Sequence, residues 1–224
     1  DDWFELQTSD FEDLLFPNIG NLTDSNSEAY GGVVVMNGGD TGIVQLGDTW
    51  EYDGVSWQEA TPDPSPSPRR QMAMTYDPDR QRIVLHGGYY KDTLETLLYG
   101  DTWEYDGSQW VEVTLPSSPP PRYGHGLAHD PRRGRLVLFG GLNLLEGLTD
   151  TWESNGVTWV EVETNSLVPS ADAVSPIVYD SWQGAVLCYR GDTWEYALRS
   201  AVPDEVCDSG VDDDGDGLID CDDP

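Results

Sequence analysis

The residues whose types and spacing best suit chemistry lie in the C-terminal segment 204–224, which contains ten acidic residues and no basic ones. Calcium binds six to eight oxygen ligands, and a twelve-residue loop with a glycine at its sixth position supplies them at regular spacing. Gly217 takes that sixth position. The predicted ligands, all carboxylates except one backbone carbonyl from a leucine, are Asp212, Asp214, Asp216, Leu218, Asp220 and Asp223. We therefore expect a Ca²⁺ site in this segment.

The aspartate spacing resembles the calcium loops of dockerins and thrombospondin type 3 repeats, and the cysteine-flanked Asp-Gly modules of secreted bacterial proteins. Cys207 precedes the loop and Cys221 lies near its end, and we expect them to form a disulfide bond, which requires an oxidising compartment. The resemblance thus implies a secreted, periplasmic or cell-surface protein. The alternative is an acidic linker that is truncated before it folds.

Signatures of catalysis are weak in the rest of the sequence. His125 and His129 are four residues apart, and on a strand they would lie about 13 Å from each other, too far to share a metal ion. His86 is interpreted as a structural residue and Cys188 as a buried small hydrophobe. No phosphate-binding loop, dinucleotide fingerprint or G-x-S-x-G motif occurs. The many carboxylates leave a glycan-cleaving site open.

The charge of the chain restricts its partners. Its 224 residues include 42 acidic and 11 basic side chains, for a net charge of −31. Such a surface repels the phosphates of nucleic acids and anionic lipid headgroups. No stretch approaches the roughly 20 apolar residues that span a bilayer. We therefore expect neither nucleic acid binding nor direct membrane insertion.

A repeated unit organises the sequence before residue 204. Its centre is the tetrapeptide Asp-Thr-Trp-Glu, which occurs four times at intervals of about 50 residues. The tryptophans of this tetrapeptide are Trp50, Trp103, Trp152 and Trp194. Three of the copies are followed by a second tryptophan, at Trp57, Trp110 and Trp159. The same three copies are preceded by an aliphatic run that ends in paired glycines.

Each repeat is predicted to form four short β-strands. The aliphatic and aromatic runs are short and are bounded by turn residues. Asp-Pro at 77–78 and 130–131 suits the turn after a first strand, and Asp-Gly at 53–54 and 106–107 suits a hairpin before a fourth. Because no helical periodicity appears, the predicted fold class is all-β.

The paired glycines, the tryptophans and the turn residues recur at matching positions in the copies, and this pattern resembles kelch repeats. The resemblance implies a kelch-type β-propeller over residues 1–203, in which each repeat forms one blade. The four copies indicate four blades. The fourth copy lacks its last strand, and residues 3–6 match the pattern of that strand, so we expect the N-terminal strand to close the ring. The alternative is a fragment of a larger ring.

The loops between the second and third strands of the repeats differ most between copies. Binding residues are frequent on such loops, because loops tolerate variation that strands do not. The candidate partner-binding residues, all leucines or tyrosines, are Tyr89, Tyr90, Leu97, Leu98, Tyr99, Leu142, Leu144 and Leu145. Their alternative role is a local hydrophobic cluster over neighbouring blades.

These observations predict a secreted or cell-surface protein that binds a protein or glycan partner without catalysis and holds a structural calcium ion. Burial of the leucine loops against a partner would make it a subunit of a larger surface assembly. The alternative is an extracellular carbohydrate-active enzyme that uses carboxylates on the propeller face. Two inward-facing carboxylates about 5–9.5 Å apart would favour that enzyme, and a leucine-lined face would favour the binding protein.

Overall fold

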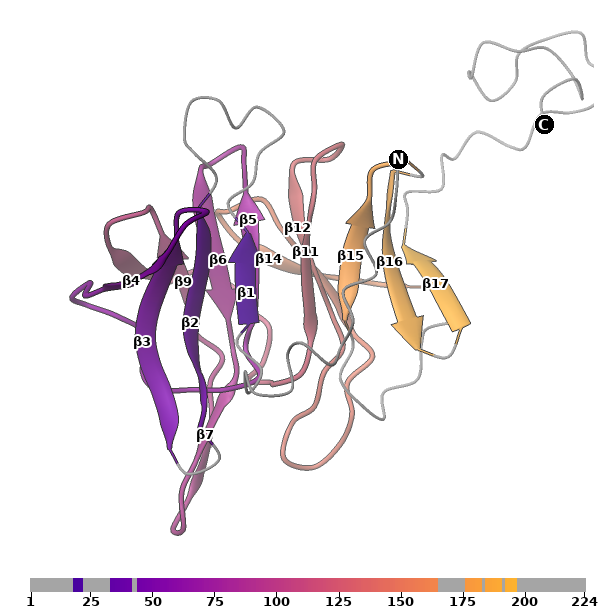
Figure 1. The fold of residues 1–224 in the computed structure, drawn as a ribbon. Coiled ribbons are helices and arrows are strands. Elements are labelled where there is room, and N and C mark those ends of the chain that lie inside the picture. Colours follow the sequence, from indigo (N-terminus) through magenta and orange to yellow (C-terminus); the bar gives the residue numbers. More distant parts are fainter. Residues whose placement is uncertain are drawn as a thin grey trace, which may run out of the picture.

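The computed structural model describes residues 18–21, 33–41, 44–164, 176–182, 184–190 and 192–196. These residues form β-strands and no helix, which confirms the predicted all-β class. The strands form five small antiparallel sheets, none of which closes on itself within the described residues (Figure 1). The predicted closing strand at residues 3–6 and the segment 204–224 lie outside the described residues.

Four of the five sheets correspond to the four repeats, and their strands are hydrogen-bonded in sequence order. The first sheet contains β1 (Asn18–Asn21), β2 (Val34–Asp40), β3 (Gln45–Tyr52) and β4 (Trp57–Ala60). The second contains β5 (Ala73–Asp77), β6 (Arg82–His86), β9 (Thr102–Tyr105) and β10 (Trp110–Val113). The third contains β11 (Gly126–Asp130), β12 (Arg135–Phe139), β13 (Thr151–Ser154) and β14 (Trp159–Val162). The fourth contains β15 (Ile177–Asp180), β16 (Ala185–Arg190) and β17 (Asp192–Tyr196).

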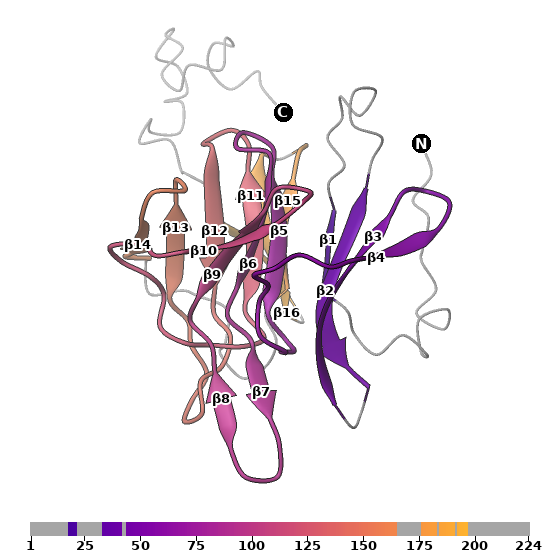
Figure 2. The same cartoon turned by 90° about the vertical axis from the view of Figure 1, so that its left-hand side faces the viewer.

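The fifth sheet is a hairpin of β7 (Tyr89–Lys91) and β8 (Thr96–Leu98), inserted between β6 and β9. The sequence predicted a variable loop here, and part of that loop pairs as a hairpin. Tyr89 pairs with Leu98 and Lys91 with Thr96, so the two arms of the insertion satisfy each other's backbone groups. Figure 2 shows the hairpin extending well beyond the end of the second sheet.

The four repeat sheets are arranged one after another through their first strands. β1 contacts β5, β5 contacts β11, and β11 contacts β15. Hydrophobic cores lie between successive sheets. The core between the first and second sheets includes Val35, Leu85 and Trp110, and that between the second and third includes Val84, Leu138 and Trp159.

In the second and third repeats, the second tryptophan packs against the preceding sheet. Trp110 on β10 is fully buried, and its indole N–H donates to the Thr49 hydroxyl of the first sheet at 3.0 Å. Trp159 on β14 is buried in the same way beside His86 of the second sheet. Trp57 on β4 is 44% exposed, because no described sheet precedes the first one. The repeated tryptophan therefore joins neighbouring sheets.

A repeated ionic contact lies within the second and third sheets, and in the third it extends to the fourth sheet. The Arg80 guanidinium bonds the Asp77 carboxylate at the end of β5 and the Glu104 carboxylate on β9. In the third sheet, the Arg133 guanidinium bonds the Asp130 and Glu153 carboxylates in the same way. Glu153 also accepts from the Tyr196 hydroxyl of the fourth sheet at 2.7 Å. Burial is the main reason that the pKa of Tyr196 rises, to about 12, and the bond to Glu153 adds to it.

Candidate functional site

The predicted partner-binding residues lie at the end of the molecule that carries the β7–β8 hairpin and the 142–148 loop (Figure 1). Leu145 is 93% exposed, Leu144 59% and Leu97 42%. Leu94, which the sequence reasoning did not select, is 91% exposed at the tip of the hairpin. A single exposed apolar side chain is ordinary, whereas several gathered at one end of a domain are typical of a contact surface.

Both loop tips are ordered by the same hydrogen bonds. The Asp92 carboxylate accepts the backbone N–H groups of Leu94 and Glu95, at 2.7 and 2.9 Å. The Asn143 side-chain oxygen accepts those of Leu145 and Glu146, at 2.7 and 2.8 Å. Such side-chain turns fix the backbone without any tertiary contact. Each tip therefore holds an exposed leucine in a defined position, with a glutamate directly after it.

The predicted tyrosines lie at the base of these loops rather than at their tips. Tyr89 is half-buried, with its ring 4.7 Å from that of Tyr123 and beneath the Arg70 guanidinium. Tyr99 is half-buried beneath the buried Arg69, with 4.0 Å between the guanidinium carbon and the ring centre. Tyr90, Leu98 and Leu142 are half-buried as well. The structure thus separates the predicted set into exposed leucine tips and a supporting aromatic base.

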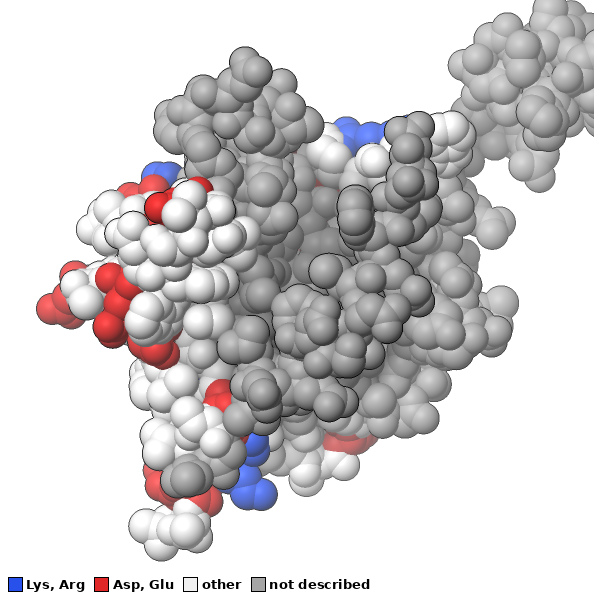
Figure 3. Space-filling model, in the orientation of Figure 1, with Lys and Arg blue, Asp and Glu red and all other residues white. Residues whose placement is uncertain are grey.

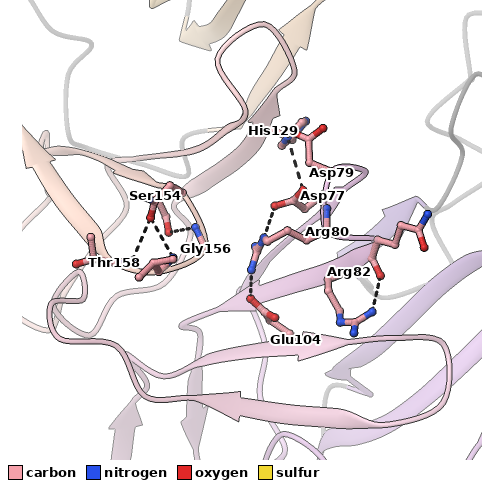
Figure 4. Close-up of polar contacts among 12 residues, drawn as sticks. Asp77, Asp79, Arg80, Arg82, Glu104, His129, Ser154, Gly156 and Thr158 are labelled. Atoms are coloured by element: carbon pink, nitrogen blue, oxygen red, sulfur yellow. Dashed lines mark hydrogen bonds and ion pairs between the residues drawn. The ribbon is translucent and has the colours of Figure 1, made fainter.

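A second group of chemically capable side chains lies at the opposite end of the sheets, where the β5–β6 turn meets β11. His129 Nε2 is 3.3 Å from Asp79 Oδ2 and 3.8 Å from Asp77 Oδ1 (Figure 4). All three ligand atoms lie within 4.8 Å of one another, so the group could hold a metal ion. The His129 and Asp77 side chains are buried, whereas that of Asp79 is 62% exposed and open to solvent.

The other two histidines do not join this group. His86 and His125 are buried against each other at the loop end of β6 and β11, with ring centres 5.4 Å apart. His86 Nδ1 lies 3.0 Å from the Thr102 hydroxyl. Burial, reinforced by the Arg122 charge, lowers the pKa of His86 to about 3, and burial also lowers that of His125. Both rings are therefore neutral at ordinary pH, as expected of structural residues.

The remaining sequence predictions have different outcomes. Cys188 is buried on β16, as expected of a small hydrophobe. The predicted calcium ligands and the cysteine pair Cys207 and Cys221 lie outside the described residues. The Asp77, Asp79 and His129 group was missed. The available signal was a departure from the repeat, because a histidine stands at 129 where the neighbouring copies have Tyr76 and Tyr179.

No helix among the described residues is long and apolar enough to cross a membrane. In Figure 3, the visible described surface carries more acidic than basic side chains, in line with the net charge of −31. No model of a known protein family matches the sequence.

Proposed function

We propose that this chain is a non-catalytic binding module, a kelch-type β-propeller that presents its leucine loop tips to a protein partner outside the cytoplasm. The observation that carries the proposal is the pair of ordered tips with almost fully exposed leucines, Leu94 and Leu145. Covering them with apolar partner surface is favourable, and little conformational entropy is lost because the tips are already ordered.

The arrangement of the sheets supports the propeller. The supporting features are four sheets in sequence order, first strands that contact one another in series, and two tryptophans, Trp110 and Trp159, that pack on the preceding sheet. A ring closed between the fourth and first sheets would cover Trp57 in the way that the first sheet covers Trp110. Radial repetition of this kind leaves only short strand edges exposed.

The chemistry of the tips favours a protein over a glycan as the partner. Aliphatic leucines offer apolar contact and no hydrogen bonds, whereas the potential hydrogen-bonding tyrosines lie half-buried beneath them. Exposed Glu95 and Glu146 stand beside the tip leucines. We therefore expect a partner surface with an apolar centre and basic residues around it, because complementary charges at the rim speed association.

Site-specific photocrosslinking in the producing cells tests this function. With a benzophenone amino acid at position 94 or 145, we expect both positions to give the same cross-linked protein. The matched controls are positions 55 and 157, where valines are 86% and 67% exposed on hairpins at the opposite end of the sheets. Equal yields at all four positions, or none at 94 and 145, would contradict the proposal, and a product of twice the chain mass would indicate self-assembly instead.

We further propose that residues 204–224 bind one structural Ca²⁺ through the aspartates that the sequence indicates, with a Cys207–Cys221 disulfide around the loop. Asp214→Asn should weaken calcium binding at least about tenfold in isothermal titration calorimetry, because it removes one charged ligand from the third position of the loop. Asp204→Asn, which lies outside the twelve-residue loop, is the control and should bind as the unsubstituted chain does. Equal affinity in both variants would refute this assignment.

A further inference from the structure

We propose that Asp77, Asp79 and His129 form a binding site for one divalent transition metal ion, with Zn²⁺ the best fit, that joins the second sheet to the third. Asp77 ends β5, Asp79 lies in the β5–β6 turn, and His129 lies on β11. β5 and β11 are the contacting first strands of the two sheets. An ion bound here would therefore be coordinated from both sides of the junction.

The spacing of the ligand atoms suits a single small ion. Zinc binds histidine nitrogen and carboxylate oxygen at about 2.0–2.2 Å, so two of its ligands at a tetrahedral angle lie about 3.3–3.6 Å apart. His129 Nε2 is 3.3 Å from Asp79 Oδ2 and 3.8 Å from Asp77 Oδ1. All three atoms lie within 4.8 Å of one another, so side-chain rotations would bring them to the spacing that one ion requires.

The buried Nε2 atom of His129 independently indicates a ligand at this position. The His129 side chain is 7% exposed, and its Nε2 makes no hydrogen bond within the described part of the chain, although it points at the two carboxylates and lies at ion-pair distance from Asp79 (Figure 4). A buried polar atom without a hydrogen bond costs free energy. Coordination through Nε2 would remove that cost, because a neutral imidazole binds a metal ion with its lone pair.

The surrounding charges leave the site free to accept a cation. The Arg80 guanidinium bonds Asp77 Oδ2 at 2.7 Å and also contacts Glu104, so it is balanced by a second carboxylate. Asp77 Oδ1 accepts the Arg80 backbone N–H at 3.1 Å and lies 3.8 Å from His129 Nε2. Two carboxylates would neutralise the charge of a divalent ion. The exposed Asp79 provides the path for entry and room for water ligands.

The ligand atoms of this site differ from those predicted in the C-terminal segment, and so does the metal ion that they favour. Calcium takes oxygen ligands, whereas zinc accepts imidazole nitrogen together with carboxylates.

The site also depends on residues that differ from those at the same positions of the other repeats. Tyr76 and Tyr179 occupy the strand position of His129 in the neighbouring sheets, each paired with the second residue of the next strand. Arg132 and Trp182 take the turn position of Asp79. The described junctions therefore provide this donor set once.

Nitrogen NMR of the full chain labelled with ¹⁵N-histidine tests the proposal directly. The chain has three histidines, and none lies in 204–224, so zinc bound by the acidic segment gives no histidine signal. We expect one equivalent of Zn²⁺ to shift the Nε2 resonance of His129 and to leave His86 and His125 unchanged. Unshifted His129 resonances at several equivalents of Zn²⁺ would overturn the proposal and leave only an ion pair between His129 and Asp79.

Substitutions separate metal binding from folding. His129→Tyr introduces the residue that the neighbouring sheets carry at this position, and Asp79→Asn changes an exposed turn residue. In the unsubstituted chain, saturating Zn²⁺ should raise Tm by about 3–8 °C. Both variants should lose that increase, whereas Asp53→Asn, in an exposed turn of the first sheet, should retain it. If Asp79→Asn folds and keeps the full increase, the proposed site is wrong.

Discussion

Replacing Arg122 with alanine is expected to lower the free energy of unfolding by about 3–5 kcal/mol, because it leaves the largely buried Asp150 carboxylate without its partner. Arg122 is fully buried before β11. Its guanidinium bonds both oxygens of Asp150 at 2.6 and 2.7 Å, and it donates to the Gly140 carbonyl at 3.0 Å. Urea denaturation followed by tryptophan fluorescence measures the loss.

Comparison variants separate the charge from the geometry. Arg122→Lys keeps the positive charge and loses the planar bidentate pairing, so it should recover only part of the lost stability. Asp92→Asn, at an exposed loop tip, should change stability by less than about 1 kcal/mol. A loss below about 1 kcal/mol for Arg122→Ala would show that water enters and solvates Asp150 at little cost.

The same pair makes stability depend on pH in the acid range. Burial by itself would raise the pKa of Asp150, but the bonds from Arg122 and from the Trp152 indole outweigh it and hold the pKa below its usual value of 3.8. A carboxyl whose pKa is depressed by folding stabilises the native state above its unfolded pKa. That contribution should therefore be complete above about pH 4–5 and should fall as the pH drops through the folded pKa.

The repeat allowed much of the fold to be predicted, because strand and turn formation depend mainly on neighbouring residues. The Asp-Gly pair at 106–107 and the Asp-Pro pair at 130–131 lie in turns between paired strands, as the sequence indicates. The β7–β8 hairpin was not predicted. Its two arms carry no strong alternation, and their pairing depends on the turn that Asp92 stabilises.

The two candidate sites were predictable to different degrees, because one depends on local turns and the other on packing between two sheets. The exposed leucines could be anticipated from loop variation, although Leu94 was missed, because exposure at a tip depends only on the local turn. The group of Asp77, Asp79 and His129 combines residues about 50 positions apart on two sheets. Only the packing of β5 against β11 brings them together. Spacing within one segment, which indicates the calcium loop, carries no information about such a contact.

Replacing Gly141 with alanine is expected to destabilise the protein by about 3 kcal/mol, because the added methyl group has no space and the backbone is unfavourable for it. Gly141 has a φ of +94°, which L residues rarely adopt. A Cβ there would lie 2.8 Å from the Tyr123 carbonyl oxygen and 2.9 Å from the His125 nitrogen. Both are backbone atoms, so the connector before β11 would have to move. Thermal and urea denaturation measure the loss.

Gly107→Ala provides a closely matched control for the conformational part of this loss. Gly107 has a φ of +89°, and a Cβ there would meet no atom within 4 Å. Its substitution should cost about 1 kcal/mol, the strain of the backbone alone. The difference of about 2 kcal/mol measures the close approach of chain segments behind Gly141.

Substitution of Gly141 should also affect the 142–148 loop. The Gly141 carbonyl accepts the Leu148 backbone N–H, so a shift at Gly141 should displace the Leu145 tip and reduce crosslinking at position 145. Equal losses for the two variants would show that the connector moves aside freely, and the loop tip would then lack the rigid base on which its proposed binding role depends.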